Sequence, residues 1–258
     1  MNFKINIFIL LALTSPAGLS SSPKALSVCT LELAGNMVTA DRRGFLIDLL
    51  NNTLGKHRPL KVELFPPVRA FHSFAKQECD VLVSASEGFI TKYTAEETIE
   101  LPIGLHDYHT VLSHSAEALE RLDLKKPQNF VSLHKWFIPQ NFKEKHSVYF
   151  AHSLENALKM LKAKRVDYFI GFNFLTREYV KQNAIKGLVY SRSIFLDPRK
   201  VVFLIHKNKG ASVIKKAFKK HMLEYLKTGG YDRDLKKHQV PSYVLMERIK
   251  FKNLLIKF

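Results

Sequence analysis

Side chains that could bind a small polar or charged solute follow several predicted strands of this chain. An arginine can clamp an anion with its forked guanidinium, hydroxyls and amides can form hydrogen bonds, and aromatic rings can stack on a flat molecule. In an open α/β sheet, ligands meet the loops beyond the carboxyl ends of the strands. This rule selects Glu32, Arg69, Ser84, Ser86, Tyr108, His134, Trp136, Phe172 and Asn173.

Several of these candidates also have a purely structural interpretation. Arg69 either clamps an anionic ligand or pairs with a carboxylate at a helix start. Ser84 and Ser86 either donate to a ligand or cap the next turn. Trp136, the only tryptophan, and Tyr108 either stack on a ligand or belong to the core. The residue types alone leave both interpretations open.

Catalysis and metal binding have less support in the sequence. Glu32, Glu87 and His134 could act as acid and base in a dehydratase-like enzyme. No nucleophile elbow, phosphate loop or paired-histidine zinc helix accompanies them. His106 and His109 lie on an extended segment at a spacing that directs them to opposite faces, which disfavours joint metal ligation. We therefore expect a binding protein, without metal or cofactor, rather than an enzyme.

Two segments of the same design must position these side chains. In each, a helix-spaced apolar stretch passes through a short polar hinge into a buried β-run. The first leads from Phe71–Ala75 to Asp80–Ser84, and the second from Leu154–Leu161 to Val166–Gly171. A helix that feeds a buried strand is half of a βαβ unit. Two such units predict two similar α/β lobes, an arrangement that creates a ligand cleft.

The rest of the chain extends this pattern to a two-lobed α/β fold. We expect a mostly parallel sheet flanked by helices in each lobe and two segments that cross between the lobes. The first lobe is discontinuous, with residues 21–105 and 198–258, and the second comprises 106–197. The other expected strands span 26–31, 60–65, 129–133, 147–150 and 200–206; the expected helices span 45–54, 68–76 and 212–227; 94–99 is a short helix or loop, 101–112 an extended crossing and 188–195 a return segment.

The C-terminal tail from Pro241 carries apolar residues at near-helical spacing with basic residues between them. Such a tail could bind a membrane surface or a partner, or it could pack against the first lobe. We favour packing as the simpler account.

The N-terminal segment 1–20 has the pattern of a secretory signal peptide. Lys4 precedes the apolar run Ile5–Leu13, and small residues follow, with Ser15 and Ala17 as a recognition pair for the peptidase. The run is too short for a membrane anchor, since spanning a bilayer takes roughly 20 apolar residues. We therefore expect a secreted, periplasmic protein.

The chain has two cysteines, Cys29 in an early β-run and Cys79 at the start of a later one. Neighbouring parallel strands could bring them within bridging distance, and export makes a disulfide possible. Two buried free thiols are the alternative. Lipidation of Cys29 is disfavoured because Val28 is bulky where small residues are expected.

The formal net charge is +17, and loss of Lys4 with the leader leaves +16. Such a charge raises the alternative of a basic surface or nucleic-acid-binding protein. However, the lysines are dispersed, mostly on expected outer helix faces, and no nucleic-acid module signature accompanies them. We interpret the charge as a solvated surface and expect no nucleic-acid partner.

A series of short motifs runs along the chain in a characteristic order. Gly44-Phe45, the segment Pro66–Ala70, Cys79–Val81 and Arg165–Asp167 follow the leader and an apolar β-run. This order resembles the family 3 extracellular solute-binding proteins, which are type II periplasmic binding proteins and include polar amino acid transporter components. The resemblance implies two lobes joined by two crossing strands. It also implies a monomer that closes on a small-molecule ligand and serves an inner-membrane ABC permease or a sensor.

One motif of that family is missing. Members that bind amino acids usually carry an arginine shortly after the third strand, which pairs with the ligand carboxylate. The corresponding segment here, Ser84–Lys92, contains no arginine. Lys92 cannot reproduce the planar, two-pronged contact of a guanidinium. The expected ligand is therefore a small polar or anionic molecule, not specifically an α-amino acid.

Overall fold

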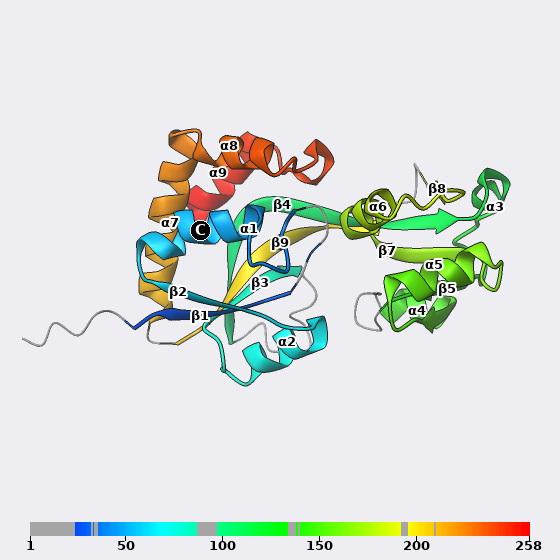
Figure 1. Cartoon of the computed structure of the whole chain (residues 1–258), viewed down its shortest axis with the longest axis horizontal. Helices are drawn as coiled ribbons and strands as arrows, with labels where there is room; N and C mark the ends of the chain where they lie inside the picture. Colours follow the sequence, from blue (N-terminus) through cyan, green and yellow to red (C-terminus); the bar gives the residue numbers. More distant parts are fainter. Residues whose placement is uncertain are drawn as a thin grey trace, which may run out of the picture.

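The computed structural model describes residues 24–31, 33, 36–86, 97–133, 138, 140–191, 196–208 and 210–258. Within these ranges, the helices and strands form two groups joined by two long strands (Figure 1). The joining strands are β4 (Thr98–Ser113) and β9 (Leu196–His206), which run antiparallel to each other. The lobe boundaries given above stay a prediction, and the predicted leader lies outside the described residues.

The strands follow one path, in which each half of the sheet is parallel and the junction is antiparallel. They are β1 (Leu26–Thr30), β2 (Leu60–Leu64), β3 (Val81–Ser86), β5 (Asn129–Ser132), β6 (Ser147–Phe150), β7 (Tyr168–Phe172) and β8 (Val189–Tyr190), with β4 and β9. The order is β2-β1-β3-β9-β4-β7-β5-β6, and β8 pairs with β4. β1 is parallel to β2 and β3, and β5 is parallel to β6 and β7. The α/β class predicted from the sequence is confirmed.

Strand β4 belongs to both groups because it is unusually long. Its first half pairs with β9, which in turn pairs with β3 of the first group. Its second half pairs with β7 and β8 of the second group. The expectation of a short helix or loop at 94–99 is wrong for Thr98 and Ile99, which open β4 and pair with His206 and Ile205. Of residues 94–97, only residue 97 lies within the described residues, and it belongs to a turn.

The two faces of the first half-sheet bury different helices. In β1, Leu26 and Val28 join the cluster that contains α1 (Phe45–Asn52), whereas Cys29 joins the cluster that contains α2 (Pro67–Ala75). This alternation is what a strand period of two requires. Helix α1 packs against this face of the sheet through a fully buried apolar stripe, whose members include Phe45, Leu46, Leu49 and Leu50.

The cysteines Cys29 and Cys79 form a disulfide, with their Cα atoms 5.8 Å apart. The bond is possible because β1 and β3 are neighbouring parallel strands. Both cysteines are buried against Ala70 and Phe74 of α2. The sequence left a disulfide and two buried free thiols as alternatives, and the structure has the disulfide.

The second group repeats the helix-then-strand design. Helix α5 (Leu154–Lys162) is capped by Ser153, whose hydroxyl accepts a hydrogen bond from the backbone N–H of Asn156 at 3.1 Å. Ala157, Leu158 and Leu161 are buried against Phe169 of β7 and its neighbours. The remaining helices, most of them not predicted, are η1 (Leu54–Lys56), α3 (Ala116–Glu120), α4 (Gln140–Lys145), α6 (Asn173–Gln182) and η4 (Ser242–Val244).

Three C-terminal helices cover the first group: α7 (Ala211–Lys227), α8 (Gly230–Lys237) and α9 (Arg248–Lys257) (Figure 1). Helix α7 ends before Gly229, which adopts a left-handed φ of 70° that suits glycine. Phe251 and Leu255 of α9 are buried in the core of the first group, so the tail packs there. Among the described residues, no helix could cross a membrane.

Candidate functional site

Three of the predicted ligand-binding residues meet where β4 crosses between the groups. Tyr108 lies in β4, Phe172 ends β7 and Asn173 begins α6. β4 and β7 are antiparallel, and Phe172 is the Cα partner of His109, the residue after Tyr108. The rings of His109 and Phe172 are stacked, with centroids 4.8 Å apart. The end of β7 is thereby fixed against the crossing strand.

The other predicted residues lie elsewhere or are not described. Ser84 and Ser86 lie within β3, and their side chains are outside the described part of the structure. Glu32, His134 and Trp136 also lie outside the described residues. The roles proposed for these five side chains stay predictions.

Asp107 is the most buried carboxylate in this region, with 7% of its surface exposed. Its Oδ1 accepts hydrogen bonds from the backbone N–H of Tyr108 at 2.8 Å and of Phe174 at 3.1 Å. Burial raises the pKa of Asp107 to about 7, although both N–H donors favour the charged form. Because Phe174 lies in the first turn of α6, Asp107 supplies a partner that a helix N-terminus otherwise lacks.

Arg177, which is not among the residues selected from the sequence, is a further candidate for this site. Its Nε donates to Oδ1 of Asn173, one turn earlier in α6, at 2.6 Å. Its guanidinium carbon lies 4.3 Å from the ring centroid of Tyr190 and 5.8 Å from that of Tyr243. Stacking of this kind suits the flat guanidinium group. The spacing of Asn173 and Arg177, four residues apart after a strand, is the signal that could have found it.

We call the set of residues around this junction the crossing cluster; its members are Asp107, Tyr108, Phe172, Asn173, Arg177, Tyr190 and Tyr243. Tyr243 comes from η4, in the segment between α8 and α9, so this cluster joins elements of both groups. Within the described residues, no carboxylate forms an ion pair with Arg177. An arginine held in this way can bind a carboxylate or another planar anion.

Arg69 lies in a separate pocket on the first group. It opens α2 together with Pro67, and its guanidinium carbon is 5.5 Å from the ring centroid of Phe65. Arg69 lines two hollows, of about 230 Å³ and about 500 Å³, which also share Ser73 and Glu78. The larger one lies within the roughly 300–1,000 Å³ of ordinary ligand pockets. Helix α2 and the β7–α6 junction belong to different groups (Figure 1), so Arg69 and the crossing cluster are distinct sites in this structure.

The histidines of β4 do not form a metal site within the described residues, where no group of three potential ligands comes together. His106 Nε2 lies 3.0 Å from the Tyr108 hydroxyl, and burial lowers the pKa of His106. His109 is instead buried against Phe172.

Neither a protein-family model nor a curated protein matches the sequence. Solved structures do match. A histidine kinase sensor domain with similarity to periplasmic binding proteins shares 17% identity over 87% of this chain and 98% of its own, with a TM-score of 0.68. The GluR0 ligand-binding core in complex with L-glutamate shares 15% identity, covering 84% of this chain and 98% of that one, with a TM-score of 0.67.

The chain has the fold of a two-lobed periplasmic binding protein. A third match, the substrate-binding protein of an amino acid ABC transporter, shares 13% identity over 83% of this chain and 98% of that chain, with a TM-score of 0.62. All three match nearly their full length, so the likeness includes both groups and the crossing strands. The two-lobed fold expected from the sequence is therefore confirmed, and in such a fold the crossing cluster lies at the junction of the lobes.

Proposed function

We propose that this chain is an exported solute-binding protein that captures a small polar or anionic ligand between its lobes, for transport or for sensing. The observation that carries the proposal is the crossing cluster, in which side chains of both groups gather along the long strand β4. A ligand that touches both lobes only when they are closed shifts the population toward the closed state. The closed, ligand-bound form would then be the one that a permease or a sensor recognises.

The chemistry of the crossing cluster favours an anionic ligand. Arg177 offers a positive charge without a described acidic partner, and the amide of Asn173 lies beside it. Arg177 also supplies a guanidinium that the segment Ser84–Lys92 lacks. The names of two structural neighbours, one in complex with L-glutamate and one of an amino acid transporter, agree with a small carboxylate as the ligand.

A thermal-shift screen of metabolites with the purified protein tests this function. A ligand at about 100 times its dissociation constant should add about 2.7 kcal/mol to the free energy of unfolding. Small carboxylates should raise the melting temperature more than their amides do. If no class of small polar molecule raises it, the proposal fails. If a hit is converted to product on incubation, the dehydratase-like alternative replaces it.

Substitution in the crossing cluster locates the binding site. Arg177→Gln keeps the length of the side chain but removes the charge, and it should weaken binding of an anionic hit by about 10-fold or more. Lys181→Gln, one turn further along α6 and exposed, removes the same charge and should leave the affinity unchanged. Equal affinity in both variants would exclude Arg177 from the ligand site.

Export is a separate part of the proposal, supported by the signal-like segment 1–20 and by the disulfide between Cys29 and Cys79. Expression of the full chain in a bacterium should yield a processed protein in the periplasmic fraction. N-terminal sequencing of that protein would locate the cleavage site near Ala17. Retention of an unprocessed chain in the cytoplasm would contradict export without affecting the ligand-binding proposal.

A further inference from the structure

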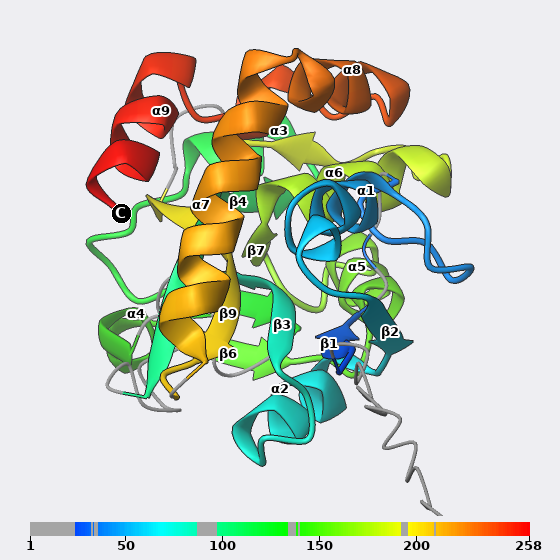
Figure 2. The ribbon, with the colours of Figure 1, turned by 90° about the vertical axis from the view of Figure 1, so that its left-hand side faces the viewer.

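Helices α7 and α9 concentrate positive charge on one side of the first group. Helix α7 has one acidic residue, Glu224, and α9 has none. The lysines of the two helices are Lys215, Lys216, Lys219, Lys220, Lys227, Lys250, Lys252 and Lys257. Figure 2 shows this side, with α7 running up the middle of the view and α9 beside it. The excess of lysine is therefore local to one surface, not only a property of the whole chain.

The two helices form one continuous surface because side chains link them. The Nζ of Lys219 donates to the backbone carbonyl of Ile256 at 2.7 Å, and the Nζ of Lys215 lies 4.2 Å from the ring centroid of Phe258. These contacts use two of the lysines. Lys216, Lys220 and Lys227 have no ion-pair partner among the described residues, and each is exposed.

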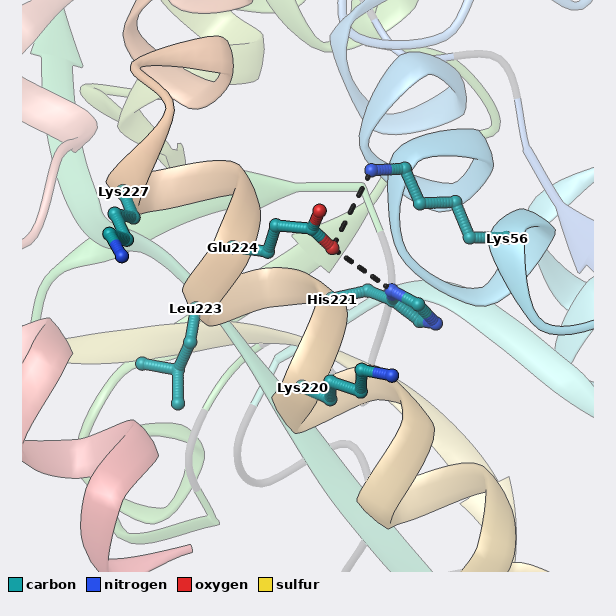
Figure 3. Close-up of a pocket in the computed structure, with 6 residues that line it drawn as sticks. All are labelled: Lys56, Lys220, His221, Leu223, Glu224 and Lys227. Atoms are coloured by element: carbon teal, nitrogen blue, oxygen red, sulfur yellow. Dashed lines mark hydrogen bonds and ion pairs between the residues drawn. The ribbon is translucent and has the colours of Figure 1, made fainter.

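The acidic residue of α7 does not neutralise these three lysines. Figure 3 shows that the carboxylate of Glu224 lies between Lys56 and His221, at 3.8 Å and 3.4 Å, while Lys220 and Lys227 extend away from it. These residues line a shallow hollow together with Leu223. The charge of Glu224 is thus already offset, and the neighbouring ammonium groups remain available to an external anion.

Exposed aliphatic side chains lie among the lysines. Val213 of α7 is 48% exposed, and Ile249 and Ile256 of α9 are 67% and 55% exposed. Ile249 and Ile256 are seven residues apart, so they lie on the same face of α9, two turns from each other. The other large apolar side chains exposed in the described part of the chain are aromatic: Tyr149, Phe150 and Tyr243.

We propose that this α7–α9 face, defined by Val213, Lys216, Lys220, Lys227, Ile249, Lys252 and Ile256, binds the surface of an anionic phospholipid membrane. Lysines near such a surface are attracted to the headgroups, and exposed aliphatic side chains enter the boundary between headgroups and acyl chains. A nucleic acid would use the lysines but would give the two isoleucines no apolar environment. The combination of both features therefore favours a lipid surface.

The position of the face makes this role independent of ligand capture. In Figure 1, α7 and α9 lie at the end of the first group that is remote from β7, α5 and the rest of the second group. A protein attached by α7 and α9 would keep its crossing cluster away from the bilayer. Attachment would hold an exported binding protein close to the membrane while its lobes open and close.

Vesicle co-sedimentation tests the proposal, with the protein carrying its native sequence as exported. Vesicles of phosphatidylethanolamine with one-third phosphatidylglycerol should bind the protein, and phosphatidylcholine vesicles should not. The variant K216E/K220E/K227E should bind the anionic vesicles about 100-fold more weakly or worse. The control K162E/K181E/K186E makes the same change in net charge at exposed lysines of the second group and should retain most of the binding.

The exposed isoleucines separate a lipid surface from a general polyanion. The variant I249S/I256S should reduce vesicle binding by about 10-fold and leave binding to duplex DNA unaltered. Equal losses in both lysine variants, an unchanged affinity in I249S/I256S, or DNA binding as tight as vesicle binding would each overturn the proposal. A cooperative thermal transition for every variant establishes folding, and K216Q/K220Q/K227Q replaces the charge-reversed variant if that one fails to fold.

Discussion

The carboxylate of Asp107 accepts a hydrogen bond from the backbone N–H of Phe174, 3.1 Å away, so a side chain of β4 stabilises the first turn of α6. The two residues are far apart in the sequence and belong to different elements. The contact fixes the start of α6 relative to the crossing strand. Asn173 and Arg177, on the first turns of that helix, are thereby oriented toward the junction between the groups.

Asp107 should make the stability of the protein depend on pH. Its pKa is about 7 in the folded state, above the ordinary value of 3.8, because it is buried. The folded state therefore holds a proton that the unfolded state has released, and the stabilisation is lost as the pH rises through about 7. Between about pH 5 and pH 8 the contribution of Asp107 should fall by about 2–3 kcal/mol.

Urea unfolding of the wild type and of Asp107→Asn at both pH values measures this contribution. The variant cannot titrate at this position. Between the two pH values, its free energy of unfolding should therefore fall by about 2–3 kcal/mol less than that of the wild type. Asp167→Asn removes an exposed carboxyl and should preserve the wild-type pH profile. Identical profiles for Asp107→Asn and the wild type would mean that Asp107 is already ionised in the folded protein at about pH 5.

Tyr190→Phe should leave the protein as stable as the wild type or more stable by up to about 1 kcal/mol. The Tyr190 hydroxyl is buried and has no hydrogen-bond partner within the described structure, whereas its ring lies against Arg177. Phenylalanine removes the unpaired hydroxyl and keeps the ring. Tyr190→Leu removes the ring as well and should cost about 1 kcal/mol more. A clear loss of stability in Tyr190→Phe, measured by urea unfolding, would contradict the unpaired hydroxyl.

The disulfide should contribute strongly to stability because it closes a long loop. Cys29 and Cys79 are separated by 50 positions, for which the chain-entropy model gives about 4 kcal/mol. We expect Cys29→Ala with Cys79→Ala to lower the free energy of unfolding by about 2–4 kcal/mol. A reductant should destabilise the wild type similarly and leave the double variant unchanged. No effect of the reductant on the wild type would show that the bridge is absent in solution.

Gly104 lies in β4 where only glycine fits, and Gly187 provides a matched comparison. Both have a positive φ, 78° and 76°. A Cβ at Gly104 would lie 2.5 Å from the ring of Phe251, whereas a Cβ at Gly187 would meet nothing within 4 Å. Gly187→Ala should cost about 1 kcal/mol from backbone strain alone, and Gly104→Ala about 3 kcal/mol, because α9 must also move. Similar losses for both would argue against tight packing of α9 on the crossing strand.

The sequence predicts the half-sheets because their signals are local. The helix-spaced stretch Phe71–Ala75 and the buried run at Val81 differ in periodicity, and a polar hinge separates them. The possibility of the Cys29–Cys79 bridge follows from strands that are neighbours in a parallel sheet. The helix and strand patterns depend on residues within one or two turns of each other, so they can be predicted without knowledge of the fold.

Helix α6 could not be predicted in the same way because its N-terminal partner is remote. The residue before it, Phe172, has no side chain that caps a helix. The partner is Asp107, a residue of another strand. The same reason hides Arg177, whose aromatic neighbours Tyr190 and Tyr243 come from two distant segments. Contacts between distant segments are a property of the fold, not of a local pattern.

The central claim is that the two lobes close on a ligand, and a distance between them measures it directly. Helices α2 and α4 lie in different groups on the same side of the crossing strands (Figure 1). Spin labels on His72→Cys and Asn141→Cys, both exposed, would react at these positions alone because the native cysteines are bridged. Saturation with a ligand found in the thermal-shift screen should shorten the distance between the labels. An unchanged distance with the ligand fully bound would contradict capture by lobe closure.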